Sequence, residues 1–120
     1  MRGVQMMSEQ PDEAEFGRIV ERAIRELEQA YADLADERDI DVEVEGGVLT
    51  VTFEEGEPGK FIVSPNSSVR QVWVSARVSS FKFNWSGESG QFVLAGTGEP
   101  LKEVMTRLTR EQLGDSSVSL

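Results

Sequence analysis

The sequence contains no cysteine and no histidine. These absences exclude disulfides, thiolate metal sites, cysteine nucleophiles and imidazole bases or ligands, and with them most common enzyme and zinc-site chemistries. The lack of disulfides favours a reducing compartment, so we expect a cytoplasmic protein. Long apolar runs are also missing, and residues 1–11 lack the apolar core of a secretory signal, so the sequence predicts neither a membrane span nor export.

Basic side chains are scarce in the first half of the chain. Residues 1–57 carry 17 acidic and 5 basic side chains, whereas residues 58–120 carry 5 acidic and 7 basic ones. The formal net charge of −10 at pH 7 is therefore concentrated on one part of the molecule. Such a surface disfavours nucleic acid as a partner and favours cations or a basic protein surface.

The length of 120 residues predicts one domain with a two-layer core. Residues 1–11 are polar and unpatterned, and we expect a disordered N-terminal extension there. The folded domain is predicted over residues 12–114, followed by a C-terminal tail at residues 115–120. Apolar residues that step by threes and fours predict two amphipathic helices, one over residues 12–34 and one that starts within residues 97–100 and ends near residue 113.

Alternating apolar and polar residues on both sides of Gly46-Gly47 predict a β-hairpin, because glycine supplies the positive φ of a tight turn. In its first strand the apolar residues share one face, and the other face carries four carboxylates: Asp39, Asp41, Glu43 and Glu45. Further strands are predicted at residues 60–63, 71–75, 81–85 and 91–95, with a loop at 64–68. The predicted fold is an α+β two-layer sandwich, with two helices packed on one face of a five- to six-stranded antiparallel sheet.

The end of the first helix and the first strand together predict an acidic ridge. Residues 26–45 hold nine acidic side chains and a single basic one, Arg38. Carboxylates without imidazole or thiolate suit hard or borderline cations such as Fe²⁺, Fe³⁺, Mn²⁺, Ca²⁺ and Mg²⁺, with little discrimination between them. On a solvated edge we expect dissociation constants on the order of micromolar or weaker. The same ridge could instead meet a basic protein surface, or be only a solvated face.

The solvent-facing side of the predicted sheet carries a second candidate surface. If the valines of residues 71–75 and the aromatic residues of 81–85 face the core, the opposite face carries Gln71, Trp73, Lys82 and Asn84. Exposed tryptophans are enriched at binding hot spots, so these four residues are predicted to bind a protein partner. The alternative is a Trp73 that neighbouring strands or the loop at 64–68 partly cover.

Three segments of the sequence together resemble one known family. They are D-I-D-V-E-V-E-G-G-V-L-T-V-T-F at residues 39–53, Q-V-W at 71–73, and an aromatic-x-F-x-x-x-G strand at 81–87. Over residues 12–113 the chain resembles the bacterial frataxins of the CyaY type. That resemblance implies the two-layer fold predicted above and a role in iron–sulfur cluster assembly. It implies weak binding of Fe²⁺ and Fe³⁺ on the acidic ridge, and docking to the cysteine desulfurase, whose activity the bacterial members modulate.

The resemblance also implies positions and partners. The metal-binding ridge positions fall on Glu28, Asp33, Glu37, Asp39, Asp41 and Glu43, and Asp36 adds a carboxylate nearby. Three ridge positions that are usually acidic carry Gln29, Ala32 and Ala35, which bears on the iron stoichiometry. The implied partners are the cysteine desulfurase and the iron–sulfur scaffold protein, with no nucleic acid and no membrane. The implied state is a monomer without iron that can oligomerise with iron.

Two other functions remain open from the residues. A ferroxidase would oxidise Fe²⁺ with oxygen, but such sites usually hold two irons among inward-facing carboxylates and histidines, and the sequence has no histidine. We therefore expect a protein without enzymatic activity. A metal-independent acidic interaction module is the third possibility, in which the ridge serves only to contact a partner.

Overall fold

Two helices flank a meander of six strands along the chain. The computed structural model describes residues 11–120. The elements are α1 (Glu13–Ala35), β1 (Ile40–Glu45), β2 (Val48–Phe53), β3 (Gly59–Asn66), β4 (Gln71–Ala76), β5 (Ser79–Ser86), β6 (Gln91–Leu94) and α2 (Leu101–Leu113). Neither helix is long and apolar enough to cross a membrane.

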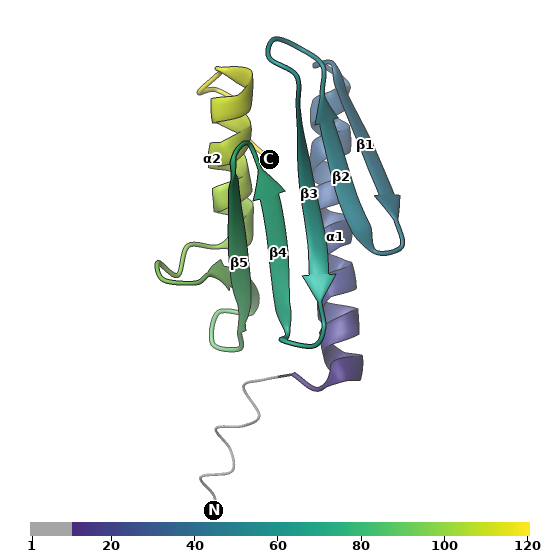
Figure 1. The fold of residues 1–120 in the computed structure, drawn as a ribbon, viewed down its shortest axis with the longest axis vertical. Coiled ribbons are helices and arrows are strands. Elements are labelled where there is room, and N and C mark those ends of the chain that lie inside the picture. Colours follow the sequence, from purple (N-terminus) through teal and green to yellow (C-terminus); the bar gives the residue numbers. More distant parts are fainter. Residues whose placement is uncertain (1–10) are drawn as a thin grey trace, which may run out of the picture.

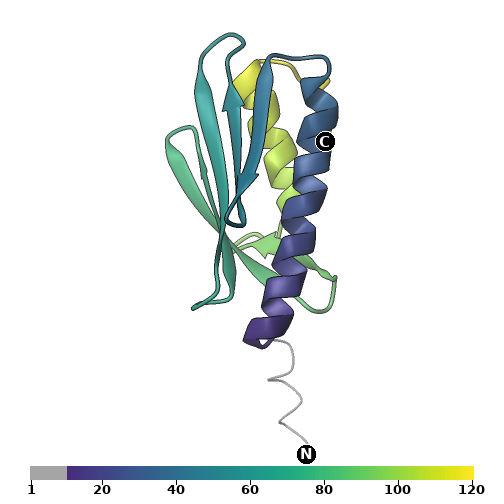
Figure 2. The ribbon, with the colours of Figure 1, turned by 90° about the vertical axis from the view of Figure 1, so that its right-hand side faces the viewer.

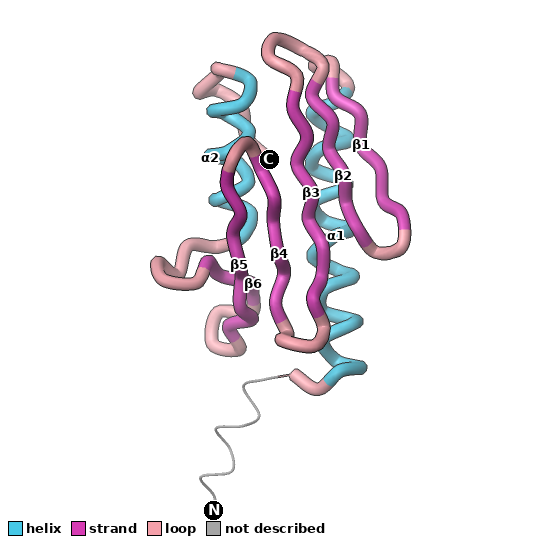
Figure 3. The backbone as a smooth tube through the Cα atoms, viewed as in Figure 1, coloured by secondary structure: helices cyan, strands magenta, loops and turns pink. Residues whose placement is uncertain are grey.

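The six strands form one antiparallel sheet in the order β1-β2-β3-β4-β5-β6. Figure 1 shows α1 and α2 behind this sheet, and the side view in Figure 2 shows that both helices cover the same face. The tube in Figure 3 follows the meander to the short strand β6. The predicted α+β two-layer sandwich is confirmed, with six strands.

Helix α1 begins and packs as its sequence predicts. The Asp12 carboxylate accepts the Glu15 N–H at 2.8 Å, which satisfies one of the free donors of the first turn. The buried stripe consists of Phe16, Val20, Ile24, Leu27 and Tyr31. Residues 1–10 of the predicted extension lie outside the described residues. Pro11 is buried, and its carbonyl accepts a hydrogen bond from Arg70 Nε at 3.1 Å.

The β1–β2 hairpin turns at the predicted glycine pair. Gly46 and Gly47 have φ values of +61° and +81°, a conformation that costs glycine least. Ile40 is buried against the core, whereas Asp41 and Glu43 on the opposite face are exposed. The alternation therefore sets which side of β1 carries its carboxylates.

Strand β3 is longer than the sequence predicts. The predicted loop at residues 64–68 is wrong for Ser64, Pro65 and Asn66, which pair with β4 as part of β3. The pairing of β2 with β3 ends at Leu49↔Val63, so Pro65 lies where β3 has a neighbour on one side only. A proline is tolerated there because its missing N–H faces no partner strand.

The second helix begins just after the range predicted for its start, residues 97–100. Pro100 is its N-cap in an extended conformation, and the helix itself begins at Leu101. A proline fits this boundary because it has no N–H to pair and fixes its own φ. Helix α2 contacts α1 through a buried hydrogen bond of 2.8 Å between the Tyr31 and Thr109 hydroxyls, and burial raises the pKa of Tyr31.

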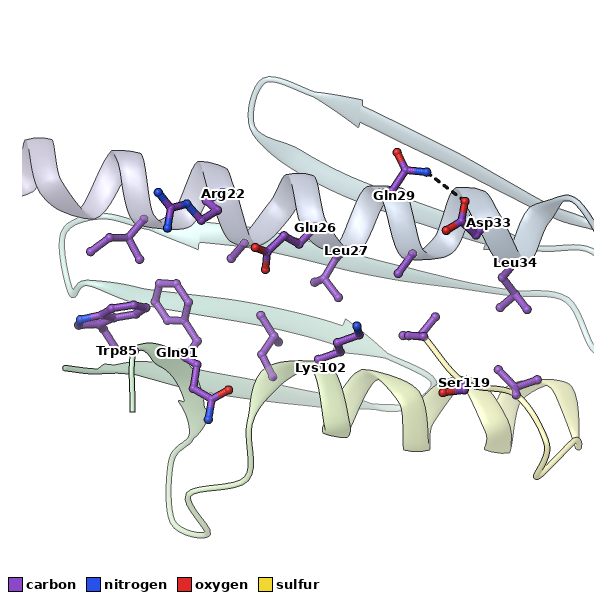
Figure 4. Close-up of a pocket in the computed structure, with 18 of the residues that line it drawn as sticks. Arg22, Glu26, Leu27, Gln29, Asp33, Leu34, Trp85, Gln91, Lys102 and Ser119 are labelled. Atoms are coloured by element: carbon purple, nitrogen blue, oxygen red, sulfur yellow. Dashed lines mark hydrogen bonds between the residues drawn. The ribbon is translucent and has the colours of Figure 1, made fainter. Parts of the chain in front are cut away.

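The residues predicted as a C-terminal tail pack back onto the helices. Val118 is only 5% exposed, and Leu120 packs against the hydrophobic core. The Arg110 Nε atom donates to the Val118 carbonyl at 2.6 Å. Figure 4 shows Ser119 of this segment in the space between α1 and α2. The tail therefore belongs to the folded unit in space, although it follows the last helix in the chain.

Candidate functional site

The predicted metal-binding residues line the end of α1, the turn after it, and β1. Six of them have exposed side chains: Asp33, Asp36, Glu37, Asp39, Asp41 and Glu43; the seventh, Glu28, is partly exposed. Helix α1 has no basic residue in its last turn, where the dipole is negative and carboxylates are unfavourable. The sequence thus places several negative side chains at a helix end where the helix dipole makes negative charge unfavourable. We call these seven residues the acidic ridge from here on.

The acidic ridge is a surface rather than an enclosed site. Among residues 11–120, no three acidic side chains converge closely enough to hold a metal ion between them. Asp41 and Glu43 lie on the open face of β1, opposite the face that packs on α1. Asp33 accepts a hydrogen bond from Gln29 Nε2 at 3.0 Å, which engages part of its capacity (Figure 4). These carboxylates suit cations that keep most of their water.

Arg38, the single basic residue of the ridge segment, is bound by two carboxylates that are not ridge residues. Its Nε and Nη2 atoms donate to the Glu55 carboxylate at 3.0 and 2.6 Å, and its Nη1 atom donates to Asp115 Oδ2 at 2.9 Å. The hydrogen bonds from Arg38 lower the pKa of Glu55. The pKa of Asp115 is lowered first by hydrogen bonds from Ser117 and then by Arg38. We call Arg38, Glu55 and Asp115 the arginine clamp.

The four residues predicted to bind a partner lie together on the open face of the sheet. Gln71 Nε2 donates to Asn84 Oδ1 at 3.0 Å, and Trp73 Nε1 donates to Gln71 Oε1 at 2.8 Å. The Lys82 ammonium lies 5.0 Å from the centroid of the Trp73 ring, within the range of a cation–π contact. Trp73 is 38% exposed. The network orients the indole, with Lys82 over its ring and part of the side chain exposed, while its role in binding stays a prediction.

Sequence reasoning missed Ile62 as a member of this face. Ile62 is 36% exposed and pairs with Ser75, two residues from Trp73 on the same face of β4. The alternation of buried Phe61 and Val63 around it was the signal that could have identified it. Ile62 and Trp73 are therefore diagonal neighbours, and both are apolar.

A groove between the two helices was also missed. Figure 4 shows α1 along one wall, with Arg22, Glu26 and Leu27, and Trp85 and Lys102 on the other side. Ser119 of the C-terminal tail lies in the same groove. No periodicity in the sequence reveals it, because it forms where two helices and a tail meet. Its charged lining residues carry both signs and include the ion pair of Arg38 with Asp115.

The chain matches the family model of the frataxin-like domain over residues 9–115. It is therefore a frataxin-like protein, which agrees with the sandwich and with the acidic edge described above. It is 38% identical over 104 residues to a protein of Pseudomonas aeruginosa named "Iron-sulfur cluster assembly protein CyaY", covering 87% of this chain and 93% of that one. A protein of the same name from Azotobacter vinelandii is 33% identical over 105 residues, covering 86% and 90%.

These similarities narrow the class to one family, and the chain belongs to the bacterial CyaY family of frataxins. A solved frataxin from Psychromonas ingrahamii superposes with a TM-score of 0.75 and covers 87% of this chain and 93% of its own. Its sequence identity is 17%, so this likeness supports the fold alone.

Proposed function

We propose that this protein acts in iron–sulfur cluster assembly in the cytoplasm, where it binds Fe²⁺ and Fe³⁺ weakly on the acidic ridge and docks to the cysteine desulfurase to modulate cluster synthesis. The observation that carries the proposal is the concentration of exposed carboxylates along the end of α1 and along β1. The names of the CyaY relatives supply the pathway. Iron is here a cargo or signal, exchangeable with other divalent cations.

The donor chemistry favours a carrier or sensor over a storage protein. The ridge offers separate carboxylates without imidazole or thiolate, and such donors hold hydrated hard cations weakly. Weak binding lets iron leave again within the time of a partner encounter. A ferroxidase would need two irons held close together, and iron oxidation no faster than in a buffer control would remove that alternative.

Docking to the desulfurase uses the ridge for encounter and the open sheet face for contact. Opposite charges accelerate association in a salt-sensitive way, so the acidic ridge would meet a basic surface of the partner. The Trp73 network lies on the same face of the sheet as Asp41 and Glu43, because all three residues point away from the helices. A desulfurase that covers β1 can therefore extend over the sheet to contact Trp73. Alternatively, Trp73 contacts the iron–sulfur scaffold protein.

The test is an amide NMR titration of the apo protein with Fe²⁺ under anaerobic conditions. We expect signals to shift or vanish at about residues 28–45, whereas amides of the Trp73 network, on the far strands, serve as internal controls and stay sharp. Millimolar protein and substoichiometric iron keep the effect local. An unchanged spectrum at excess iron would reduce the ridge to a docking or solubility surface and would refute the metal part of the proposal.

Divalent cations should also stabilise the fold. The ridge carboxylates repel one another in the native state, so neutralising them favours folding. We expect millimolar Ca²⁺ or Mg²⁺ to raise the melting temperature by roughly 5 °C, and added NaCl to act in the same direction but less at equal ionic strength. Thermal unfolding followed by circular dichroism measures this. A melting temperature that does not change when divalent cations are added would contradict a concentration of carboxylates on the ridge.

A further inference from the structure

Arg38 lies inside the acidic ridge in sequence, but its side chain pairs with two carboxylates outside the ridge. It falls between Glu37 and Asp39, whose side chains are exposed, whereas its own side chain is only 19% exposed. A guanidinium released at this position would find the neighbouring carboxylates within reach of its long side chain and would pair with them. It would then compete with any cation for those carboxylates. What holds Arg38 away therefore bears on the proposed function.

The arginine clamp joins three segments that are distant in sequence. Glu55 belongs to the turn between β2 and β3, and Asp115 follows the last helix directly. Figure 2 shows the end of α1, the β2–β3 turn and the end of α2 at the same end of the molecule. Glu55 Oε1 also accepts the backbone N–H of Asp39 at 3.2 Å, so the clamp fixes a ridge residue as well as Arg38.

Asp115 is itself held in place for this contact. Its Oδ1 atom accepts the Ser117 N–H at 2.9 Å and the Ser117 hydroxyl at 2.6 Å, which leaves Oδ2 for Arg38 Nη1. The side chains of Glu55 and Asp115 are 39% and 35% exposed, and ion pairs this exposed contribute little to stability. The larger consequence of the clamp is the position of a positive charge.

We propose that Glu55 and Asp115 sequester Arg38 from the acidic ridge, so that the packed C-terminal tail sets the affinity of the ridge for cations. This inference rests on the proposed function of the ridge. Arg38 is a positioning residue in this scheme, because it acts on the cation only through the carboxylates it leaves free. Loss of Asp115 removes the partner of Nη1, while Nε and Nη2 stay on Glu55, so one edge of the guanidinium becomes free to pair with a ridge carboxylate.

The experiment is a double-mutant cycle on Mn²⁺ binding, followed by the relaxation of ridge amide signals. Asp115→Asn can keep the Ser117 hydrogen bonds but gives up the charge that pairs with Arg38 Nη1, leaving Glu55 as the remaining partner. We expect it to weaken Mn²⁺ binding roughly two- to fivefold, the effect of one exposed ion pair. In an Arg38→Gln background the same Asp115→Asn change should have no effect, because no competing guanidinium remains. Melting temperatures show that every variant folds.

Glu111→Gln is the matched control, because it removes an exposed carboxylate from α2 four residues earlier and leaves Arg38 untouched. It should leave Mn²⁺ affinity unchanged. Equal weakening by Asp115→Asn and Glu111→Gln would mean a bulk charge effect and would overturn the inference. So would an unchanged affinity of Asp115→Asn, while ridge binding by the unaltered protein would still support the proposed function. No ridge binding by the unaltered protein would overturn both.

Discussion

Replacing Asp39, Asp41 and Glu43 by lysine is expected to abolish iron binding. The change converts three of the seven ridge carboxylates into cations and alters the local charge by six units. We expect the dissociation constant for Fe²⁺ to rise about 100-fold or more, on the order of 3 kcal/mol, because a cation would then approach a positive edge. Anaerobic calorimetry or the NMR titration measures the loss. Desulfurase binding at low salt should weaken as well, since the encounter surface is reversed.

The matched control places lysine at three other exposed acidic positions, Glu88, Glu103 and Glu111. It changes the net charge equally but leaves the ridge intact, so iron binding should persist. A ridge variant that still bound iron as tightly as this control would refute the assignment of the site. A variant that lost iron but kept the desulfurase would show that metal and partner use different surfaces, and would favour the Trp73 face for docking.

Local patterns were sufficient to predict the elements that carry the site. The stripe from Phe16 to Tyr31 fixes which side of α1 is buried, and therefore which side presents acids. The glycine pair fixes the hairpin, and the alternation in β1 fixes its exposed carboxylates. Parity alone predicted that Gln71, Trp73, Lys82 and Asn84 share one face; the register that pairs Gln71 with Asn84 and Trp73 with Lys82 comes from the structure.

Features that depend on distant segments could not be predicted from the sequence. The composition of Ser64-Pro65-Asn66 indicates a loop, yet these residues continue β3 and pair with β4, at positions where β3 has no partner in β2. Arg38 and Asp115 are 77 residues apart, and no local pattern connects them. The sequence marks Arg38 only as a break in an acidic run. The bidentate pairing of Arg38 with Glu55 and the packing of the C-terminal tail can be identified only from the three-dimensional structure.

The same limit applies to the acidic ridge. Sequence spacing predicts many carboxylates on one edge, but whether they converge on a point depends on the angle between α1 and β1. In residues 11–120 they are spread along α1, the turn after it and β1, and no three of them converge to hold a metal ion. The number of carboxylates on the ridge therefore does not give the number of ions that the ridge binds tightly. Iron stoichiometry therefore has to be measured, and substitutions such as Ala32 and Ala35 would lower it further.

Truncation of Trp73 to alanine is expected to remove most of the partner affinity while leaving the fold and the metal site unchanged. A tryptophan at the centre of an interface commonly contributes about 2 kcal/mol or more, so binding to the cysteine desulfurase or scaffold protein should weaken roughly 30-fold or more. Because Trp73 is 38% exposed and lies on the open face, the core loses little when it is removed. Binding is measured by calorimetry with each purified partner.

Two companion variants separate the ring from its surroundings. Trp73→Phe keeps an aromatic face under Lys82 but loses the N–H that binds Gln71, so it should retain an intermediate affinity. Val78→Ala truncates a fully exposed apolar side chain in the turn between β4 and β5 and should bind normally. If Trp73→Ala bound both partners within twofold of the unaltered protein, the open face would not be the docking surface. Fe²⁺ affinity should stay the same in all three variants, because none of them alters a ridge carboxylate; a parallel loss of iron would mean that ridge and sheet face act as one site.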